Sequence, residues 1–238
     1  MTKLNKAVLG TVATLAVVTW GVKTASSPNY DNQDVLVPSP KASVPIVGTR
    51  TELNRLSLTQ PETKTVKTLK VDPKRTVTID FPIGYYEHLD NAVKKELNEL
   101  GNSKEPIYVL LNSPGGSVDV GNEFVSLMQA ADGPVYTVCV GLCASMAAII
   151  LEHGTKRFAL DRSTIMFHDA SGGARGSLGE MNSILQFYRR GIEKTNRYIA
   201  ERSSMKYETF MELQKDNLWI DAEDAKSLNL IDDLVRLK

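Results

Sequence analysis

The sequence predicts an α/β fold, because strand-like and helix-like segments alternate through its second half. Two segments, at residues 107–111 and 135–140, are continuous apolar runs, which is typical of parallel strands buried on both faces. Each run leads through glycines into a helix-like segment, as in α/β proteins. The 238 residues carry 28 basic and 28 acidic side chains, and this neutral balance argues against a nucleic-acid partner.

Residues 1–25 are predicted to be a signal peptide or a membrane anchor. Lys3 and Lys6 precede an uncharged apolar run at 7–22, and small residues that a signal peptidase could cut follow it. The run is slightly short for a membrane span and slightly long for the apolar part of a signal peptide. We therefore expect a chain that is membrane-anchored or exported, with a cytoplasmic chain as the alternative.

Residues 26–72 are predicted to be a flexible tether. This segment is rich in Pro, Ser and Thr, and such a composition cannot bury enough apolar surface to fold by itself. Short pieces such as residues 44–47 could pair with a sheet edge. The folded domain is expected at residues 73–238.

The first half of this domain is predicted to be strand, helix, strand and helix, at residues 76–81, 86–100, 107–111 and 119–131. The first strand alternates polar and apolar residues, as half-buried strands do. Both helices carry apolar residues on one face, and Gly101 ends the first of them.

The second half begins with the strand at 135–140 and a buried helix after Ser145. Two short strands follow at 157–160 and 164–167, and a capping box of Ser177 and Glu180 then opens a long helix to about residue 202. Five apolar side chains share one face of this helix: Met181, Ile184, Leu185, Tyr188 and Ile192. The last expected elements are a short helix at 208–213, a helix that Asp221 caps, and a strand at 230–235.

Ser145 lies where a buried strand is predicted to turn into a helix. Backbone N–H groups are unpaired at a helix N-terminus, and the helix dipole favours negative charge there. A serine at this place can simply cap the helix. It can also be a nucleophile beside a ready-made site for an oxyanion.

A second motif, Asn-Ser-Pro-Gly-Gly-Ser-Val at residues 112–118, follows the strand at 107–111 directly. It stands at the carboxyl end of that strand, where open α/β sheets bind ligands. Gly115 and Gly116 would let the backbone approach a substrate and turn N–H groups outward. An ordinary tight turn is the alternative.

Among the three histidines, His168 is the best candidate for a general base by elimination. His153 follows Ser145 on the same helix, about 12 Å along the axis, which is too far to take the serine's proton. His88 is expected to be solvated, whereas His168 ends a strand. A structural role for His168 is the alternative.

Cys139 and Cys143 are expected to be small buried hydrophobes rather than a redox pair. No spacing of His, Cys and carboxylate residues suggests a metal site, and we expect no cofactor.

Four motifs in register resemble the Clp protease proteolytic subunit (ClpP) family. Besides residues 112–116, they are Gly-Leu-Cys-Ala-Ser-Met at 141–146, Lys-Arg-Phe-Ala-Leu at 156–160 and Ile-Met-Phe-His at 165–168. The resemblance covers roughly the last two-thirds of the chain. It implies a ClpP/crotonase-like fold of repeated strand-strand-helix units, with an extended handle helix, here 177–202, that mediates ring assembly.

The resemblance also implies a catalytic site. Ser145 would be the nucleophile and His168 the base, and the backbone N–H groups of Gly116 and Met146 would form the oxyanion hole. Substrate would lie extended between two backbone segments, as an added β-strand. The substrate-binding residues would be Gly115, Ser117 and Val118 on one side and a strand with Gly172 and Gly173 on the other.

The third catalytic position of the family falls on Asn217, eight residues before Ala225. A side-chain amide oxygen can accept the histidine Nδ1–H and fix its tautomer, but it cannot stabilise the imidazolium by charge. Asp216 is the alternative, although on an extended segment its side chain would point to the opposite face.

The sequence therefore predicts a serine endopeptidase that hydrolyses peptides or unfolded proteins in an oligomeric ring. One alternative is a membrane-linked peptidase resembling signal peptide peptidase A, which shares the Ser-Pro-Gly-Gly-Ser-Val string but uses a lysine base. Another is an inactive ring-forming scaffold. An acyl-CoA enzyme of the crotonase type is less expected, because that chemistry does not need Ser145 and His168 together. An unfoldase ATPase as partner is uncertain, because ATP is absent outside the cell.

Overall fold

The computed structural model of the protein describes residues 66–238. The predicted signal peptide or anchor and the tether up to residue 65 lie outside the described residues, so both stay predictions from the sequence. Within residues 66–238, none of the helices combines the length and the apolar character needed to cross a bilayer.

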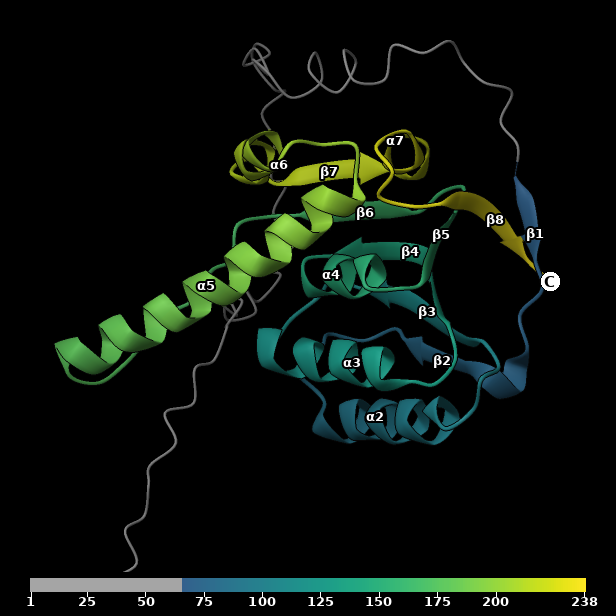
Figure 1. Cartoon of the computed structure of the whole chain (residues 1–238), viewed down its shortest axis with the longest axis horizontal. Coiled ribbons are helices and arrows are strands. Elements are labelled where there is room, and N and C mark those ends of the chain that lie inside the picture. The colour runs from purple at the N-terminus through teal and green to yellow at the C-terminus, as the bar shows by residue number, and fades with distance from the viewer. Residues whose placement is uncertain (1–65) are drawn as a thin grey trace, which may run out of the picture.

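One sheet of mostly parallel strands runs through the domain (Figure 1). Its main path has the order β1-β8-β5-β4-β3-β2, while β6 pairs with the end of β4 and β7 runs antiparallel to β6. The strands are β1 (Lys67–Leu69), β2 (Thr76–Ile79), β3 (Ile107–Ser113), β4 (Val135–Ala144), β5 (Lys156–Leu160), β6 (Thr164–Phe167), β7 (Leu218–Asp221) and β8 (Asp233–Leu237). The predicted α/β class is confirmed, and the sheet is consistent with the ClpP-like fold.

Helices α2, α3 and α4 cover one face of the sheet (Figure 1). The helices are α2 (Glu87–Gly101), α3 (Val118–Ala130), α4 (Met146–Glu152), α5 (Leu178–Arg202), α6 (Tyr207–Gln214) and α7 (Ala222–Ser227), with a short 3-10 turn, η1 (Pro73–Arg75). The main core lies between these helices and the sheet, where Phe124, Leu111 and Ile150 are fully buried.

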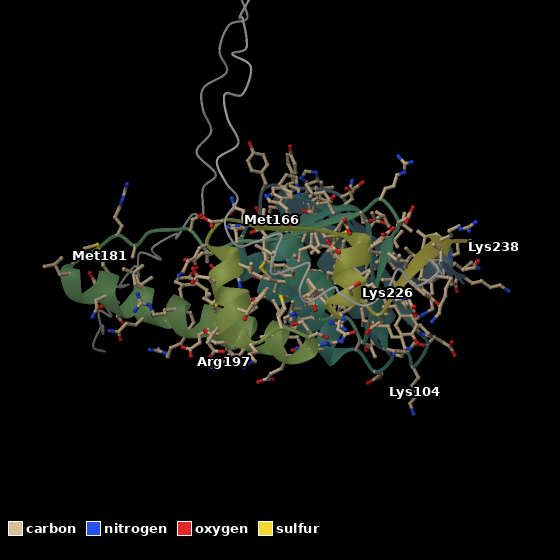
Figure 2. All side chains as sticks on the ribbon, turned by 90° about the horizontal axis from the view of Figure 1, so that it is seen from above. Lys104, Met166, Met181, Arg197, Lys226 and Lys238 are labelled. Atoms are coloured by element: carbon tan, nitrogen blue, oxygen red, sulfur yellow. A yellow bond between two sulfur atoms is a disulfide. The ribbon has the colours of Figure 1, made fainter. Side chains whose placement is uncertain are left out.

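Helix α5 projects out of the domain, as expected of a handle. Met181 lies at its outer end and Arg197 lies where it joins the body (Figure 2). The predicted capping box is present, because Ser177 Oγ accepts from Glu180 N and Glu180 Oε2 accepts from Ser177 N. The fully buried side chains, Asn196, Ile199 and Ala200, all come from the last two turns, while farther out Tyr188 OH donates to Asp119 of α3 over 3.1 Å.

The sheet begins earlier in the chain than the sequence indicated. Lys67–Leu69, which we placed in the tether, form the edge strand β1 and pair in parallel with β8. Three residues are too few to show a periodic pattern, so this strand depends on the partner strand that it meets in the fold. The predicted boundary of the folded domain at residue 73 is therefore too late in the chain.

Strand β4 does not end at Gly141 but passes it through a bulge. Leu111 pairs with Cys139 and Ser113 pairs with Cys143. An advance of two residues along β3 therefore corresponds to an advance of four residues along β4, which defines a bulge in β4. In a regular strand, residues four apart would be separated by about 13 Å. The Cα atoms of Cys139 and Cys143 are only 6.0 Å apart.

The two cysteines form a disulfide across the base of this bulge. Our expectation of two unlinked buried hydrophobes was wrong, because it assumed a straight strand that stops at Gly141. Both residues are fully buried, as expected, but the bulge brings them within bonding reach. The cross-link lies two residues before Ser145.

A buried ion cluster holds the far end of α4. Arg157 of β5 donates to Glu152 Oε2 over 2.8 Å and to Asp232 Oδ1 over 3.0 Å. Glu152 is fully buried, and its other oxygen, Oε1, has no hydrogen-bond partner among residues 66–238. Helix α4 is thus fixed at its C-terminus by charged groups, while its N-terminus faces the predicted site.

Candidate active site

The predicted site residues gather where three parallel strands end. Gly115 and Gly116 follow β3, Ser145 follows β4 directly, and His168 follows β6 directly. The pairs Ser113–Cys143 and Ala144–Met166 bring these carboxyl ends level along the sheet. Residues from three distant parts of the chain therefore meet at one edge, which is where open α/β sheets carry ligand sites.

Ser145 occupies the N-cap position of α4 but does not cap the helix. Its side chain makes no capping hydrogen bond, and Oγ instead lies 2.7 Å from His168 Nε2. Its backbone has φ 56° and ψ −122°, a conformation that non-glycine residues rarely adopt. The N–H of Ser145 is held by the carbonyl oxygen of Met166 at 2.8 Å. The simple N-cap interpretation is therefore wrong, and the serine is aimed at the histidine.

The other two histidines lie away from Ser145. His153 caps the C-terminus of α4, where its Nδ1 is 2.8 Å from Ile149 O and its ring stacks on Tyr198. Burial lowers the pKa of His153, which fits a neutral structural histidine. His88 is exposed at the start of α2. Of the three, only His168 contacts Ser145 within the described part of the chain.

Two backbone N–H groups beside Ser145 are free to bind an anion. Within residues 66–238, neither the N–H of Met146 nor that of Gly116 donates to an acceptor. Met146 is the first residue of α4, so its N–H has no intrahelical partner. Gly115 packs directly on this turn, because a Cβ on it would lie 2.8 Å from Met146 N. Two free N–H groups beside a serine are what an oxyanion hole requires, and the assignment of Gly116 and Met146 to that role stays a prediction.

Asn217 lies beside His168 in the strand register but is not bonded to it. The antiparallel pair Phe167–Leu218 makes His168 and Asn217 the next residues outward on β6 and β7. Asn217 is exposed, and no residue within 66–238 accepts a hydrogen bond from His168 Nδ1. The assignment of Asn217 as third catalytic residue therefore stays a prediction.

The segment around Asn217 is a turn, not the extended stretch that we expected. The N–H of Asn217 donates to Gln214 O over 3.2 Å and its φ is 59°, which asparagine tolerates better than most residues. The argument that placed Asp216 on the opposite face of a strand was therefore wrong. Asp216 is exposed in this turn.

The predicted substrate-binding segments are only partly as expected. Gly172 and Gly173 are exposed and belong to an irregular segment, so the strand implied there is not formed. Ser117 caps α3, with its Oγ accepting from Val120 N over 3.4 Å, and Val118 is the first residue of that helix. Both residues are partly exposed next to Gly116.

The sequence analysis assigned no role to three polar residues that hold the segments around the site, although two of them belong to the motif at 112–118. Ser113 Oγ donates to Phe81 O over 2.6 Å and accepts from Gly115 N over 3.1 Å, which ties the glycines to the neighbouring loop. Asn112 Oδ1 accepts from Leu142 N over 3.0 Å and so holds the β4 bulge. The third is Asp90, and its signal was present: it shares a helical face with Val93 and Leu97, where an acidic residue is out of place.

The model of the Clp protease family matches residues 63–238, well over half of the chain. The chain belongs to the Clp protease family. This assignment confirms the resemblance and supports a peptidase, hence a hydrolase, at the level of the family. The match begins four residues before β1, which agrees with a domain that starts earlier than residue 73.

No metal centre accompanies this site in the described part of the chain. Among residues 66–238, His, Cys, Asp and Glu side chains form no group of three or more that could hold a metal ion. The groups that the structure gathers at the site are a serine, a histidine and backbone N–H groups.

Proposed function

We propose that this Clp protease family member is a serine endopeptidase acting on peptides or unfolded proteins. The observation that carries the proposal is the 2.7 Å contact between Ser145 Oγ and His168 Nε2. A serine oxygen within hydrogen-bond reach of an imidazole is the arrangement of an activated nucleophile. A lysine-based site of the signal peptide peptidase A type would need a lysine in place of this imidazole.

The proposed reaction follows the acyl-transfer scheme of serine peptidases. Ser145 Oγ attacks the scissile carbonyl while His168 Nε2 takes its proton. The oxyanion that forms is held by the N–H groups of Gly116 and Met146. The imidazolium then gives its proton to the leaving amine, and water releases the acyl group from Ser145 by the reverse sequence.

Labelling by a fluorophosphonate probe tests this proposal on the full chain. The probe is expected to react with wild-type protein and to leave its adduct on Ser145. Ser145→Ala should not be labelled, whereas the control Ser183→Ala, at an exposed serine of α5, should be labelled like the wild type. Absence of labelling and of peptide hydrolysis in the wild type would instead indicate an inactive scaffold.

Asn217→Asp is expected to raise kcat by about tenfold or more, because a carboxylate beside His168 would stabilise the imidazolium that an amide cannot. Aspartate tolerates the positive φ of this position as asparagine does. Steady-state hydrolysis of a fluorogenic peptide measures the change, with Asp216→Ala as the control that should change little. Loss of activity in Asp216→Ala, with Asn217→Ala active, would make Asp216 the orienting acid instead.

We further propose that the chain assembles into a ring through α5. The projecting part of this helix leaves large apolar side chains in solvent: Leu178 is 83% exposed, Phe187 64% and Leu185 52%. Such a surface is unusual for a monomer. Light scattering should therefore give several times the monomer mass, and Phe187→Lys together with Leu185→Lys should lower it. A monomeric wild type at micromolar concentration would contradict the proposal.

A further inference from the structure

The glycines beside Ser145 are held in place by a loop from another part of the chain. Ile83, in the loop between β2 and α2, forms a parallel bridge with Gly116. Ile83 N donates to Gly115 O over 2.9 Å, and Ser117 N donates to Ile83 O over 2.8 Å. The backbone on both sides of Gly116 is thus clamped to a single residue.

This pairing determines where the Gly116 N–H points. In a parallel bridge, one residue bonds to the two neighbours of the residue opposite it. Here Ile83 bonds to Gly115 and Ser117, so the N–H and C=O of Gly116 itself are directed away from Ile83. The N–H of Gly116 is therefore turned away from Ile83 and left free. Movement of Ile83 would move the groups on both sides of this donor.

Asp90 holds the Ile83 loop from the first turn of α2. Both of its carboxylate oxygens accept from the N–H of Gly84, at 3.2 and 3.1 Å. Asp90 is only 2% exposed while Gly84 is exposed, so the bond is shielded from water on the carboxylate side. Gly84 in turn packs against Ser117, because a Cβ on it would lie 2.5 Å from Ser117 Cβ.

We infer that Asp90 is a positioning residue, which fixes the Gly116 oxyanion donor through Gly84 and Ile83. The inference rests on the proposed peptidase function. Asp90 contacts neither Ser145 nor His168, so its effect on catalysis is exerted only through the loop. An oxyanion donor acts through its exact distance to the developing charge, and displacements of about 1 Å can cost on the order of a hundredfold in rate.

Burial of the Asp90 carboxylate opposes its ionisation. Burial raises the pKa of Asp90, and the hydrogen bond from Gly84 and the charge of Lys94 act in the opposite direction. Within residues 66–238, the Gly84 N–H is the only hydrogen-bond donor to this carboxylate. A buried acid with one backbone N–H as its partner is poorly explained by stability alone.

Three variants of the full chain test the inference. Asp90→Ala removes the acceptor and should lower kcat for a fluorogenic peptide by about tenfold or more, with KM within about twofold of wild type. Asp90→Asn keeps an acceptor oxygen and should recover most of kcat. Glu87→Ala, in the same first turn but exposed, is the matched control for the loss of an acidic side chain and should match wild type.

Backbone hydrogen exchange gives a second readout that does not depend on activity. Asp90→Ala should speed exchange of the Gly84 and Ser117 amides, while amides of α5 exchange as in the wild type. A wild-type kcat in Asp90→Ala, or a kcat loss in Asp90→Asn as large as in Asp90→Ala, would overturn the inference. If the wild type neither hydrolyses peptide nor reacts with the probe, the proposed function fails, and the exchange rates alone decide whether Asp90 fixes the loop.

Discussion

His168→Ala is expected to lower kcat for peptide hydrolysis by at least about a thousandfold, and Ser145→Ala by a similar factor. Without the imidazole, no group within hydrogen-bond reach of Ser145 Oγ can take its proton, because His168 Nε2 is the only side-chain partner of that oxygen within residues 66–238. Without the serine, the histidine has no nucleophile to activate. KM should change much less than kcat, because neither group is needed to hold the peptide.

The double variant separates a catalytic pair from two independent residues. Groups that act as one unit are strongly non-additive, so Ser145→Ala with His168→Ala should be hardly slower than either single variant. His153→Ala is the matched control, because His153 is the histidine at the other end of α4. Full activity in His168→Ala would show that another base serves Ser145, and thermal unfolding of each variant would exclude misfolding as the cause of a loss.

Much of the site could be predicted from the sequence because its parts follow parallel strands. The apolar runs of β3 and β4 and the motif ending in His168 each mark the carboxyl end of a strand, and these ends meet in any parallel sheet. The strand ends marked Gly116, Ser145 and His168 as separate candidates, and the family resemblance joined them into one site. The role of each still depends on the motif resemblance and on the experiments above.

Other features could not be predicted because they depend on contacts between distant residues. The disulfide forms only because β4 bulges past β3, and a periodic pattern cannot show a change of register. Strand β1 needs β8 beside it. The turn at Asn217 replaces an extended segment because the end of α6 accepts its N–H, which local alternation does not show.

Arg157→Met is expected to lower the free energy of unfolding by about 1–3 kcal/mol, because a buried carboxyl group loses its hydrogen-bond donor. The substitution keeps an apolar stem in β5 but removes the guanidinium that binds both Glu152 and Asp232. Two carboxyl groups would remain at a site where the Glu152 side chain is 0% exposed and that of Asp232 is 36% exposed. Urea unfolding followed by circular dichroism measures the loss.

The control for Arg157→Met is Arg162→Met, at an exposed position in the turn after β5, where a change within about 0.5 kcal/mol is expected. Equal stability of the two variants would show that the cluster contributes nothing. A loss in Arg157→Met without any change in kcat would show that α4 keeps Met146 in place even when its far end is weakened.

The free energy of unfolding of Glu152→Gln, minus that of the wild type at the same pH, should increase as pH rises from about 5 to 8. Burial raises the pKa of Glu152 from its ordinary 4.5 to about 8, although Arg157 opposes the shift. The folded state therefore binds the proton of Glu152 more tightly than the unfolded chain does. Its contribution to stability is complete below pH 4.5 and is lost as pH rises through about 8, because ionising the buried carboxyl then opposes folding. Glutamine cannot ionise, so it lacks this loss.

The measurement is the free energy of unfolding of both proteins at pH 5 and at pH 8. Taking the difference between the two proteins at each pH cancels the opposite contribution of His153, which is present in both. A difference that stays constant with pH would show that Glu152 remains ionised beside Arg157 throughout the range.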